Sequence, residues 1–280
     1  MKPASFEYHA PRTIEDAVAL LAQLAPEEGR VLAGGQTLVP AMALRLARPG
    51  HLVDINGVAG LDAIAIEGDV LSIGACVRHA ALGADAAPGP LGRLLGLVQH
   101  HIAHGPIRTR GTFCGSLANA DAASEWCLLA TALDARIEAR STRGARTIEA
   151  DSFFLGYMTT ALEADELITC AMLPLLPAGT RVGFYEFARR AGDFAQVMAL
   201  VTYEVQNGVI ARPRVAVGAI DSRARRLAEA EAMLTGATPA LTTFAAAGAS
   251  AAAALTLPED ESYLRALCEA AIVRALSEAR

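Results

Sequence analysis

A short apolar strand that runs directly into two glycines and a helix start limits the folds open to this chain more than any other stretch. The segment is VLAGGQTLVP, residues 31–40. Gly34 and Gly35 allow a sharp turn and close approach to a ligand, and Pro40 is a favoured first-turn helix residue. Successive free amides in such a turn attract a phosphate, although Gly-Gly turns also occur for conformational reasons alone. The third glycine and downstream acidic residue of a Rossmann turn are missing.

A second stretch rich in small and hydroxyl-bearing residues, RGTFCGSLANADAASEW, occupies residues 110–126. Its glycines and hydroxyl groups would let a flat ligand and its diphosphate lie close to main-chain amides. Glu125 is suited to accepting hydrogen bonds from ribose hydroxyls. The alternative interpretation is a loop with an Asn or Asp helix cap.

The composition is that of a globular protein. Hydrophobic residues make up 53% of the 280 residues and charged residues 19%, which indicates neither disorder nor a membrane protein. No apolar run reaches the roughly 18–20 residues of a spanning helix, and the start shows no secretory signal, so we expect no membrane span and a cytoplasmic location. The net charge is −6 and the arginines are scattered, which argues against nucleic acid as a partner.

The cysteines argue against a metal cluster or a disulfide framework in this chain. They are Cys76, Cys114, Cys127, Cys170 and Cys268, and none stands at CxxC spacing. An odd number without a signal peptide is unlike a disulfide framework, and an iron–sulfur cluster normally needs four suitably placed thiolates. An electron carrier would therefore be an organic cofactor or would lie on a partner.

The pattern along the chain changes near residue 176. The predicted helices before it are 13–24, which Thr13 can cap, 40–46, 91–104 and 122–133. The predicted strands are 30–33, 51–55, 70–75, 135–140 and 167–174. After it we expect antiparallel strands at 194–205, 209–210 and 215–220, then helices at 224–234, 242–254 and 262–278. Asn207-Gly208 supplies a hairpin turn. Pro174, Pro177 and Gly179 suggest a domain junction, so we divide the chain at residue 176.

Together these segments resemble the FAD-binding subunits of the molybdenum hydroxylase family. AGGQT at 33–37 resembles the family's AGG-x-S/T/D turn, and TFCG at 112–115 resembles its T-x-G-G turn. NADAASE at 119–125 is similar to its following N/H-A-D-P-A-x-D/E segment. DELI at 165–168 and YEFARRAGDFA at 185–195 resemble two further stretches, the second of which opens the family's C-terminal domain. Several motifs in the expected order are more specific than any one of them.

The resemblance implies an α+β protein with a PCMH-type FAD-binding fold. Two α/β subdomains, at about 1–56 and 57–176, would together form an FAD-binding domain at 1–176. A smaller α+β C-terminal domain at 177–280 would contain an antiparallel sheet and helices.

The resemblance also implies which residues contact FAD. They are Leu32, Ala33, Gly34, Gly35, Gln36, Thr37, Leu38, Thr112, Phe113, Cys114, Gly115, Ser116, Asn119, Asp121, Glu125 and Ile168. Residues 33–38 and 112–116 would line the diphosphate, with Asn119 and Asp121 close by. Glu125 would hold a ribose or adenine-side polar group, and Ile168 would pack on the flavin or the adenine. No catalytic residue and no metal ligand is expected in this chain.

The implied function is electron transfer inside a heteromeric complex. The partners would be a molybdopterin-binding large subunit and a 2Fe-2S small subunit. Electrons would reach the flavin from the iron–sulfur clusters and leave to NAD, a quinone, oxygen or another acceptor. The alternatives are a self-sufficient flavoenzyme of the same fold, such as a MurB-like reductase or an oxidase, and a scaffolding protein that has lost its cofactor.

Three residues depart from the family pattern. Cys114 stands where many relatives have glycine, and Ala122 stands where proline is common. Phe187 stands where many relatives have lysine, so no flavin contact is expected there.

A histidine cluster falls at the end of a predicted helix. His100 and His104 would share one helix face at metal-compatible spacing, with His101 between them. Because no third ligand is visible, a polar patch near the cofactor or a partner is the favoured interpretation over zinc.

Overall fold

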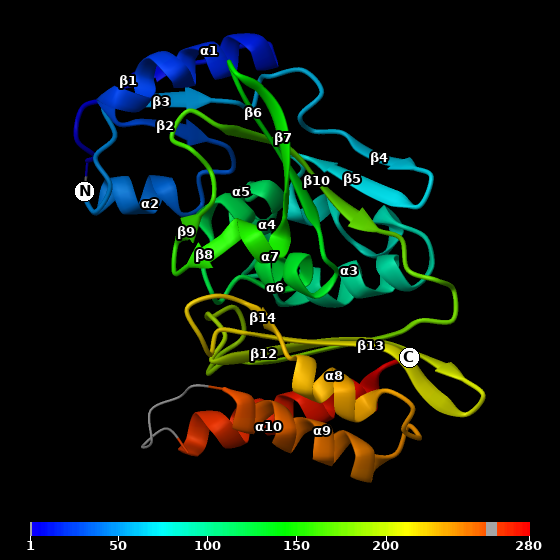
Figure 1. Ribbon diagram of the computed structural model, residues 1–280. Helices are drawn as coiled ribbons and strands as arrows, with labels where there is room; N and C mark the ends of the chain where they lie inside the picture. Colours follow the sequence, from blue (N-terminus) through cyan, green and yellow to red (C-terminus); the bar gives the residue numbers. More distant parts are fainter. Residues whose placement is uncertain (1, 256–261) are drawn as a thin grey trace.

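Three β-sheets, formed one after another along the chain, organise the protein (Figure 1). The computed structural model describes residues 2–255 and 262–280. In this part of the chain helices lie on both sides of the first and third sheets, and the sheets stack from the N-terminal to the C-terminal end of the molecule.

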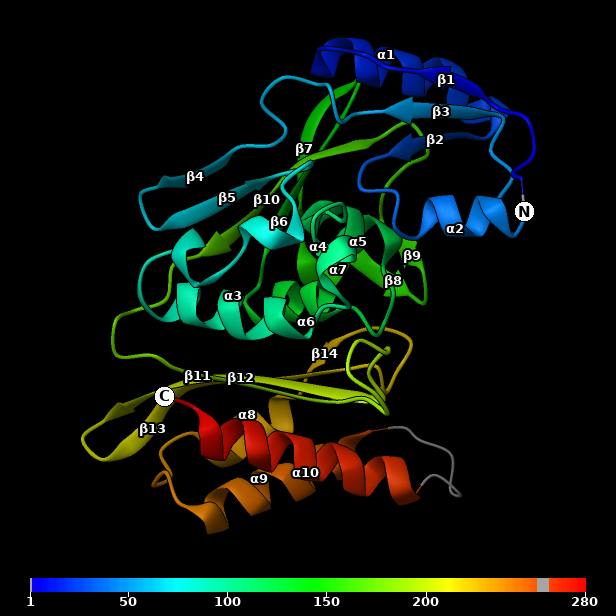
Figure 2. The same cartoon turned by 180° about the vertical axis from the view of Figure 1, so that it is seen from behind.

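The first sheet contains three parallel strands in the order β1-β3-β2. The elements of this region are β1 (Glu7–His9), α1 (Ile14–Leu24), the 3-10 helix η1 (Ala25–Glu27), β2 (Gly29–Leu32), α2 (Leu38–Ala43) and β3 (His51–Asp54). Helix α1 covers one face of the sheet and α2 lies on the other (Figures 1 and 2). The predicted cap of α1 is confirmed, because the Thr13 hydroxyl accepts a hydrogen bond from the Asp16 amide at 3.1 Å.

The second sheet contains five strands in the order β4-β5-β10-β6-β7, and every pair is antiparallel. Its strands are β4 (Ile64–Glu67), β5 (Val70–Gly74), β6 (Arg136–Ser141), β7 (Gly144–Glu149) and β10 (Leu167–Pro174). A separate small hairpin consists of β8 (Phe154–Gly156) and β9 (Thr159–Thr160). The helical elements are η2 (His79–Ala81), η3 (Ala84–Ala86), α3 (Gly89–His101), α4 (Gly105–Arg108), α5 (Phe113–Asn119), α6 (Glu125–Ala132) and α7 (Ala150–Phe153).

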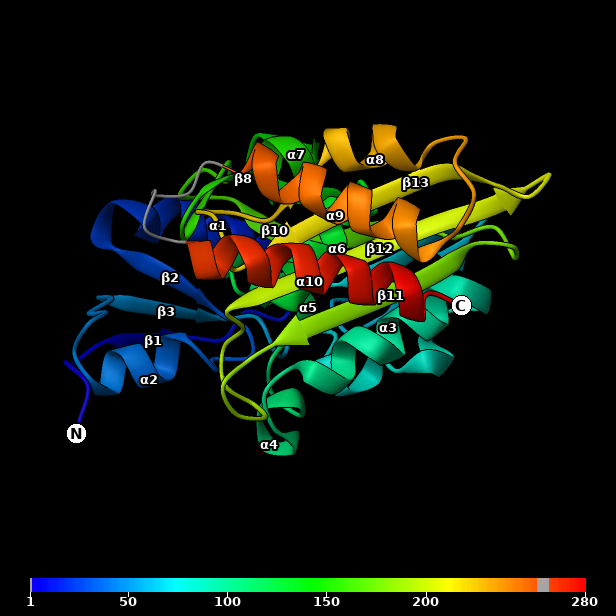
Figure 3. The ribbon, with the colours of Figure 1, turned by 90° about the horizontal axis from the view of Figure 1, so that it is seen from below.

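The third sheet is antiparallel, in the order β11-β12-β13-β14. The elements of this region are β11 (Arg181–Phe187), β12 (Val197–Gln206), β13 (Val209–Gly218), β14 (Arg225–Arg226), α8 (Ala228–Leu234), α9 (Leu241–Ala254) and α10 (Ser262–Glu278). Figure 3 shows the three helices lying across the strands. Asn207 and Gly208 both have positive φ, at 52° and 81°, which confirms the predicted hairpin turn.

Helix α6 packs on one side against other helices of the second region, residues 64–174, and on the other side against the third sheet. All of its residues from Trp126 to Ala132 are buried, so the helix has no solvent-facing stripe. It contacts β12 and β13, while α3 contacts β11 on the same side of the sheet. The other side carries α8 and α10, with α9 packed on both. As a result, the first seven residues of β12 are all buried.

The fold class expected from the sequence is confirmed, but several elements differ from the predictions. The helix predicted at 91–104 ends at His101, because Ile102 is extended and Ala103 has a φ of 39°. The strands predicted at 209–210 and 215–220 are one strand, β13, whose register shifts midway. The helix predicted at 122–133 begins only at Glu125.

Candidate functional site

The first glycine turn connects β2 to α2. Gly35 has a φ of 70°, in the left-handed region that glycine adopts without strain. The Gln36 side chain donates a hydrogen bond back to the Gly34 carbonyl at 3.0 Å, which stabilises the turn. Thr37 is the N-cap residue of α2, but its side chain makes no capping hydrogen bond. The hydroxyl of Thr37, which is exposed, is therefore open to a ligand.

The backbone amides of this turn are left without protein acceptors. Across residues 2–255 and 262–280, none of the five amides from Gly34 to Leu38 donates a hydrogen bond to the protein. The first amide of the segment that does so is that of Val39, which donates to the Gly35 carbonyl at 3.0 Å. Unpaired amides that are only half-buried need an outside acceptor, either water or a ligand. Five successive N–H groups form a binding surface for an anion.

The second glycine segment lies directly against the first, although it is far away in the chain. A Cβ atom on Gly34 would stand 2.5 Å from the Arg110 carbonyl oxygen and 2.6 Å from the Gly111 Cα. A Cβ on Gly115 would stand 4.0 Å from the Ala33 Cβ. The absence of a side chain at Gly34 therefore allows the two main chains to meet. The two segments that the sequence singled out converge in one place.

Asn56 and Arg78 hold the two segments together, and sequence reasoning did not identify either residue. The Asn56 side-chain amide donates to the Ala33 carbonyl at 2.8 Å. The Arg78 guanidinium donates both to the Asn56 side-chain oxygen and to the Arg110 carbonyl. Through Asn56, one arginine thus connects the start of the first turn to the start of the second segment. No motif marks these residues, because their role depends on tertiary contacts.

Most backbone amides from Phe113 to Ser116 in the second segment donate hydrogen bonds to acceptors within the protein. The Thr112 hydroxyl accepts from the Gly115 amide at 3.1 Å and caps α5. The Phe113 amide donates to the Val77 carbonyl at 3.1 Å, and the Ser116 amide donates to the Thr112 carbonyl. In the part of the chain that the structure describes, the Cys114 amide is the one left without an acceptor between Phe113 and Ser116.

Cys114 has its thiol in the protein core. Its side chain is buried, and Sγ lies 3.6 Å from the Ile73 carbonyl oxygen. Burial raises the pKa of the thiol well above its ordinary value, so the group stays neutral and unreactive. The side chain that replaces the family's glycine therefore points away from the free amide of this segment. Phe113 is also fully buried.

The segment after α5 carries the remaining polar candidates. Asp121 accepts a hydrogen bond from the Ala123 amide at 2.9 Å, which closes a turn between α5 and α6. Asn119 is half-buried, and no hydrogen bond of its side chain occurs among the described residues. Glu125 is the first residue of α6, after the cap residue Ser124. Burial, with a smaller contribution from Asp121, raises the pKa of Glu125 to about 7.

A second carboxyl group, which the sequence did not reveal, lies near Glu125. Glu186 on β11 has a side chain that is 4% exposed, and its Oε2 has no hydrogen-bond partner among the described residues. Burial and the charge of Glu125 raise the pKa of Glu186 to about 8. The Nδ1 atom of His101 lies 3.9 Å from the same oxygen. The three side chains come from α3, α6 and β11, and they lie where the second region meets the third sheet.

The buried side chains of His79 and Trp126 pack against the second segment. The Trp126 indole N–H donates to His79 Nδ1 at 2.9 Å. The Nε2 atom of His79 would meet a Cβ on Gly111 at 2.4 Å, so the ring packs on the backbone of that glycine. Burial, together with Arg78 and Arg108, lowers the pKa of His79 to about 4, which keeps the ring neutral. Trp126, which is fully buried, therefore has a packing role.

Two other candidate groups occupy different places. Ile168 lies on β10 opposite Ala139 of β6 and is only 5% exposed, so it belongs to the core of the second sheet. The expectation that His100 and His104 share a helix face is wrong, because α3 ends between them. His104 instead packs its ring against Gly192.

No helix in the described residues is both long and apolar enough to cross a lipid bilayer.

Both the sequence and the structure of the chain match those of known proteins. The FAD binding domain in molybdopterin dehydrogenase matches residues 4–176, and the CO dehydrogenase flavoprotein C-terminal domain matches residues 183–279. The nicotine 6-hydroxylase medium subunit of Paenarthrobacter nicotinovorans is 41% identical over 236 residues, which cover 84% of this chain and 82% of that protein. The carbon monoxide dehydrogenase medium chain of Afipia carboxidovorans is 39% identical over 211 residues, covering 74% and 72%. A structure of carbon monoxide dehydrogenase from Hydrogenophaga pseudoflava matches with a TM-score of 0.93 and 35% identity, covering 100% of this chain and 98% of that one.

Proposed function

The chain belongs to the family of FAD-binding medium subunits of molybdopterin-dependent dehydrogenases, and on this premise we propose that it is the electron-transfer subunit of a heteromeric molybdenum hydroxylase. When bound, FAD supplies the redox chemistry by which electrons from a partner's iron–sulfur clusters reach NAD, a quinone, oxygen or another acceptor. The contribution of this chain is to bind and orient the cofactor. It supplies no acid or base to an organic substrate.

The observation that carries the proposal is the convergence of the two glycine segments around unpaired amides. The diphosphate of FAD needs hydrogen-bond donors and little steric bulk, and the turn from Gly34 to Leu38 provides both. We assign the diphosphate mainly to these five amides, with the amide of Cys114 as a donor from the second segment. Leu32 and Ala33 lead into the turn, and the Thr37 hydroxyl extends it.

The polar groups after the second segment suit the sugar and base portions of the cofactor. Ser116 and Asn119 are half-buried, and the Asn119 side chain is open to both donate and accept. Asp121 would act through the turn that it closes, which sets the position of α6. Glu125 would accept hydrogen bonds from ribose hydroxyls as a carboxylate. A donor bound there would lower its raised pKa.

In this proposal the C-terminal region supports the FAD-binding region, because the third sheet packs against α3 and α6. We propose a division of the chain near residue 176, with an FAD-binding domain at 1–176 and a C-terminal domain at 177–280. The arrangement of the sheets supports it, because β10, the last strand of the second sheet along the described chain, ends at Pro174 and the third sheet begins at Arg181. A C-terminal domain of this kind, in a chain to which we assign no substrate chemistry, suits a role in assembly with a molybdopterin-binding large subunit and a 2Fe-2S small subunit.

The proposal is tested by purifying the chain alone and with its native partners. We expect the chain alone to be yellow, to release FAD on acid treatment, and to turn over no organic substrate. In the native complex, we expect the flavin to be bleached by the organic substrate, with molybdenum and iron–sulfur subunits present. Turnover by the isolated chain would instead favour a self-sufficient MurB-like or oxidase-type flavoenzyme. A colourless chain that takes up no FAD would favour a scaffolding role.

A further inference from the structure

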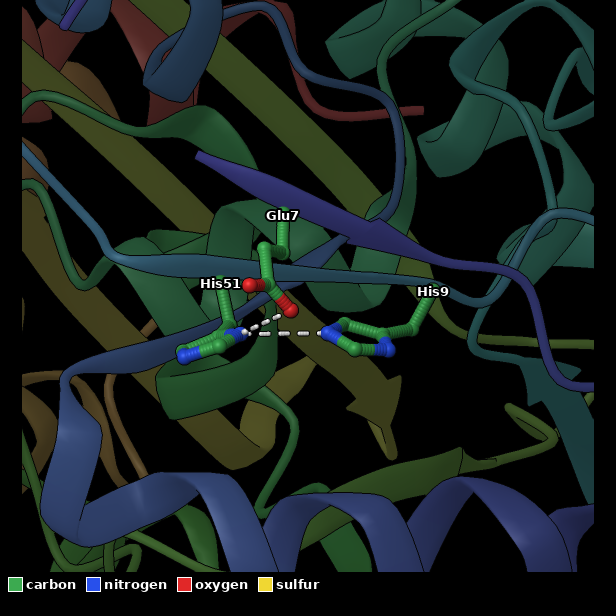
Figure 4. A group of neighbouring side chains, drawn as sticks. All are labelled: Glu7, His9 and His51. Atoms are coloured by element: carbon green, nitrogen blue, oxygen red, sulfur yellow. Dashed lines mark hydrogen bonds and ion pairs between the residues drawn. The ribbon is translucent and has the colours of Figure 1, made fainter. Parts of the chain in front are cut away.

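A cluster of metal-ligating side chains lies at the edge of the first sheet, away from the glycine turns. Glu7 and His9 stand two residues apart on β1, so their side chains leave the same face of the strand. His51 is the first residue of β3 and lies opposite Glu7 in the parallel register. Figure 4 shows the three side chains turned toward one another. The chain folds so that residues far apart in sequence place a carboxylate and two imidazoles together.

The spacing of the three ligand atoms matches that of a tetrahedral metal site. His9 Nε2 and His51 Nδ1 are 3.1 Å apart, and His51 Nδ1 is 3.7 Å from Glu7 Oε2. All three ligand atoms lie within 4.8 Å of one another. A zinc ion about 2.0–2.1 Å from each ligand puts neighbouring ligand atoms about 3.3 Å apart. A metal ion can therefore enter with only small side-chain adjustments.

A fourth residue orients the central imidazole. Glu27, at the end of η1, places Oε2 3.2 Å from His51 Nε2. A carboxylate accepts a hydrogen bond, so it holds the proton of His51 on Nε2 and leaves the Nδ1 lone pair facing Glu7 and His9. A carboxylate behind a metal-binding histidine is the usual second layer of such sites. This arrangement is independent of the spacing of the ligand atoms and points to the same conclusion.

The cluster is accessible to an ion from solvent. The side chain of Glu7 is 74% exposed, whereas that of His51 is 13% exposed, so the site is anchored on one side and open on the other. A hollow of about 500 Å³ begins at His9 and continues along α1 past Arg12 and Asp16. Water from this hollow can supply a fourth ligand.

We propose that Glu7, His9 and His51 form a binding site for one divalent transition-metal ion of the zinc class, which ties the edge strand β1 to β3. Two imidazoles and one carboxylate suit Zn²⁺, and also Co²⁺ or Ni²⁺, better than Mg²⁺ or Ca²⁺, which prefer oxygen ligands. On binding, the ion replaces the hydrogen bond between the two histidines, and His9 takes the tautomer that carries its proton on Nδ1, so that the Nε2 lone pair is free to bind the ion. The site is independent of FAD binding.

The test uses the full chain with FAD bound, treated with a chelator and then titrated with Zn²⁺ by calorimetry. We expect one ion per chain, and His9→Gln should weaken binding by more than about a hundredfold. Glu27→Gln should weaken it by about tenfold, because only the orientation of His51 is lost. His100→Gln, an exposed histidine on α3, is the matched control and should leave zinc binding unchanged.

A second measurement keeps the result separate from any effect on folding. Zinc in about hundredfold excess over its Kd should raise the unfolding temperature of the unaltered chain by about 5 °C or more, and that of His9→Gln by much less. FAD content should be equal in all four proteins. The proposal is overturned if the unaltered chain binds no more zinc than His9→Gln does, or if His100→Gln abolishes binding.

Discussion

The glycine turn after β2 and the strand β12 of the third sheet differ in whether their backbone groups are hydrogen-bonded within the protein. From Gly34 to Leu38, five amides find no acceptor in the described protein, and the segment is half-buried to exposed. Strand β12 pairs with β11 along one edge and β13 along the other, and its residues 197–203 are buried. Both regions consist mostly of small and apolar residues, so composition does not distinguish them.

The difference shows which glycine contacts indicate a binding site. Gly34 and Gly183 are alike in that a Cβ on either would collide with a backbone carbonyl, at 2.5 Å from Arg110 and at 2.0 Å from Ala275. At Gly183 the close approach lets β11 pack on α10, while β11 stays paired with β12 from Arg181 to Phe187. At Gly34 the close approach accompanies unpaired amides. Close packing at a glycine is therefore structural unless open donors accompany it.

The largest effect is expected for Gly34→Ala. The added methyl group would separate the first turn from Arg110 and Gly111, because neither backbone can move without disturbing the other. We expect FAD affinity to fall by about a hundredfold or more, so that the purified protein is colourless. Equilibrium dialysis with FAD measures the change. Gly179→Ala is the control, since a Cβ there meets nothing within 4 Å; equal FAD loss in both variants would contradict the assignment.

The next effect is expected for Gly183→Ala, and it should affect stability and not the cofactor. A methyl group 2.0 Å from the Ala275 carbonyl forces β11 and α10 apart. We expect the free energy of unfolding to fall by about 1–3 kcal/mol. Chemical denaturation measures this loss, and FAD affinity in the folded protein should stay within error of the unaltered chain. A large loss of FAD affinity would show that the two regions are not separable.

The same contrast explains what the sequence could predict. The turn at 33–37 and the cap Thr13 are local features, because a few adjacent residues determine their geometry, and they were identified correctly. The end of α3 was misplaced, because His101 and His104 continue the helical pattern while Ala103 takes a left-handed conformation. The short helix α5 is not among the predicted helices, since its glycine and hydroxyl residues resemble turn residues.

Other features of the site depend on tertiary contacts that no sequence pattern records. Asn56 and Arg78 act through carbonyl groups of residues distant in the chain. Glu186 comes close enough to Glu125 for its pKa to be affected only because α6 packs against the third sheet, to which β11 belongs. His9 and His51 meet because β1 and β3 pair in one particular register, and a shift by one residue would move the side chains of one strand to the other face.

A smaller effect, with a defined pH dependence, is expected for Glu186→Gln. The pKa of Glu186 is raised to about 8 in the fold by burial and by Glu125, against 4.5 for an unperturbed carboxyl group. The folded state therefore holds a proton that the unfolded chain releases, and stability is lost as the pH rises from about 4.5 to about 8. Glu186→Gln removes this loss. We expect its unfolding free energy, relative to the unaltered chain, to increase by about 2 kcal/mol between about pH 6.5 and pH 9.

The measurement is chemical denaturation at several pH values. Because His101 also faces this carboxyl group, the variant His101→Gln should be measured alongside to separate the two titrations. Glu229→Gln, on the exposed side of α8, is the control and should follow the unaltered chain at every pH. A Glu186→Gln curve parallel to that of the unaltered chain would show that the carboxyl group ionises normally.

The smallest effect is expected for Arg78→Lys, and it tests whether the contact between the two glycine segments must be held by a bridge. The guanidinium reaches Asn56 and the Arg110 carbonyl at the same time, whereas a lysine ammonium cannot span both positions. Loss of one such hydrogen bond costs about 1 kcal/mol, so we expect FAD affinity to fall by about three- to tenfold. Arg93→Lys is the matched control, because Arg93 bridges the carbonyls of Thr180 and Arg280 away from the turns. If Arg78→Lys binds FAD as tightly as Arg93→Lys does, packing at Gly34 alone holds the turns together and the bridge has no part in it.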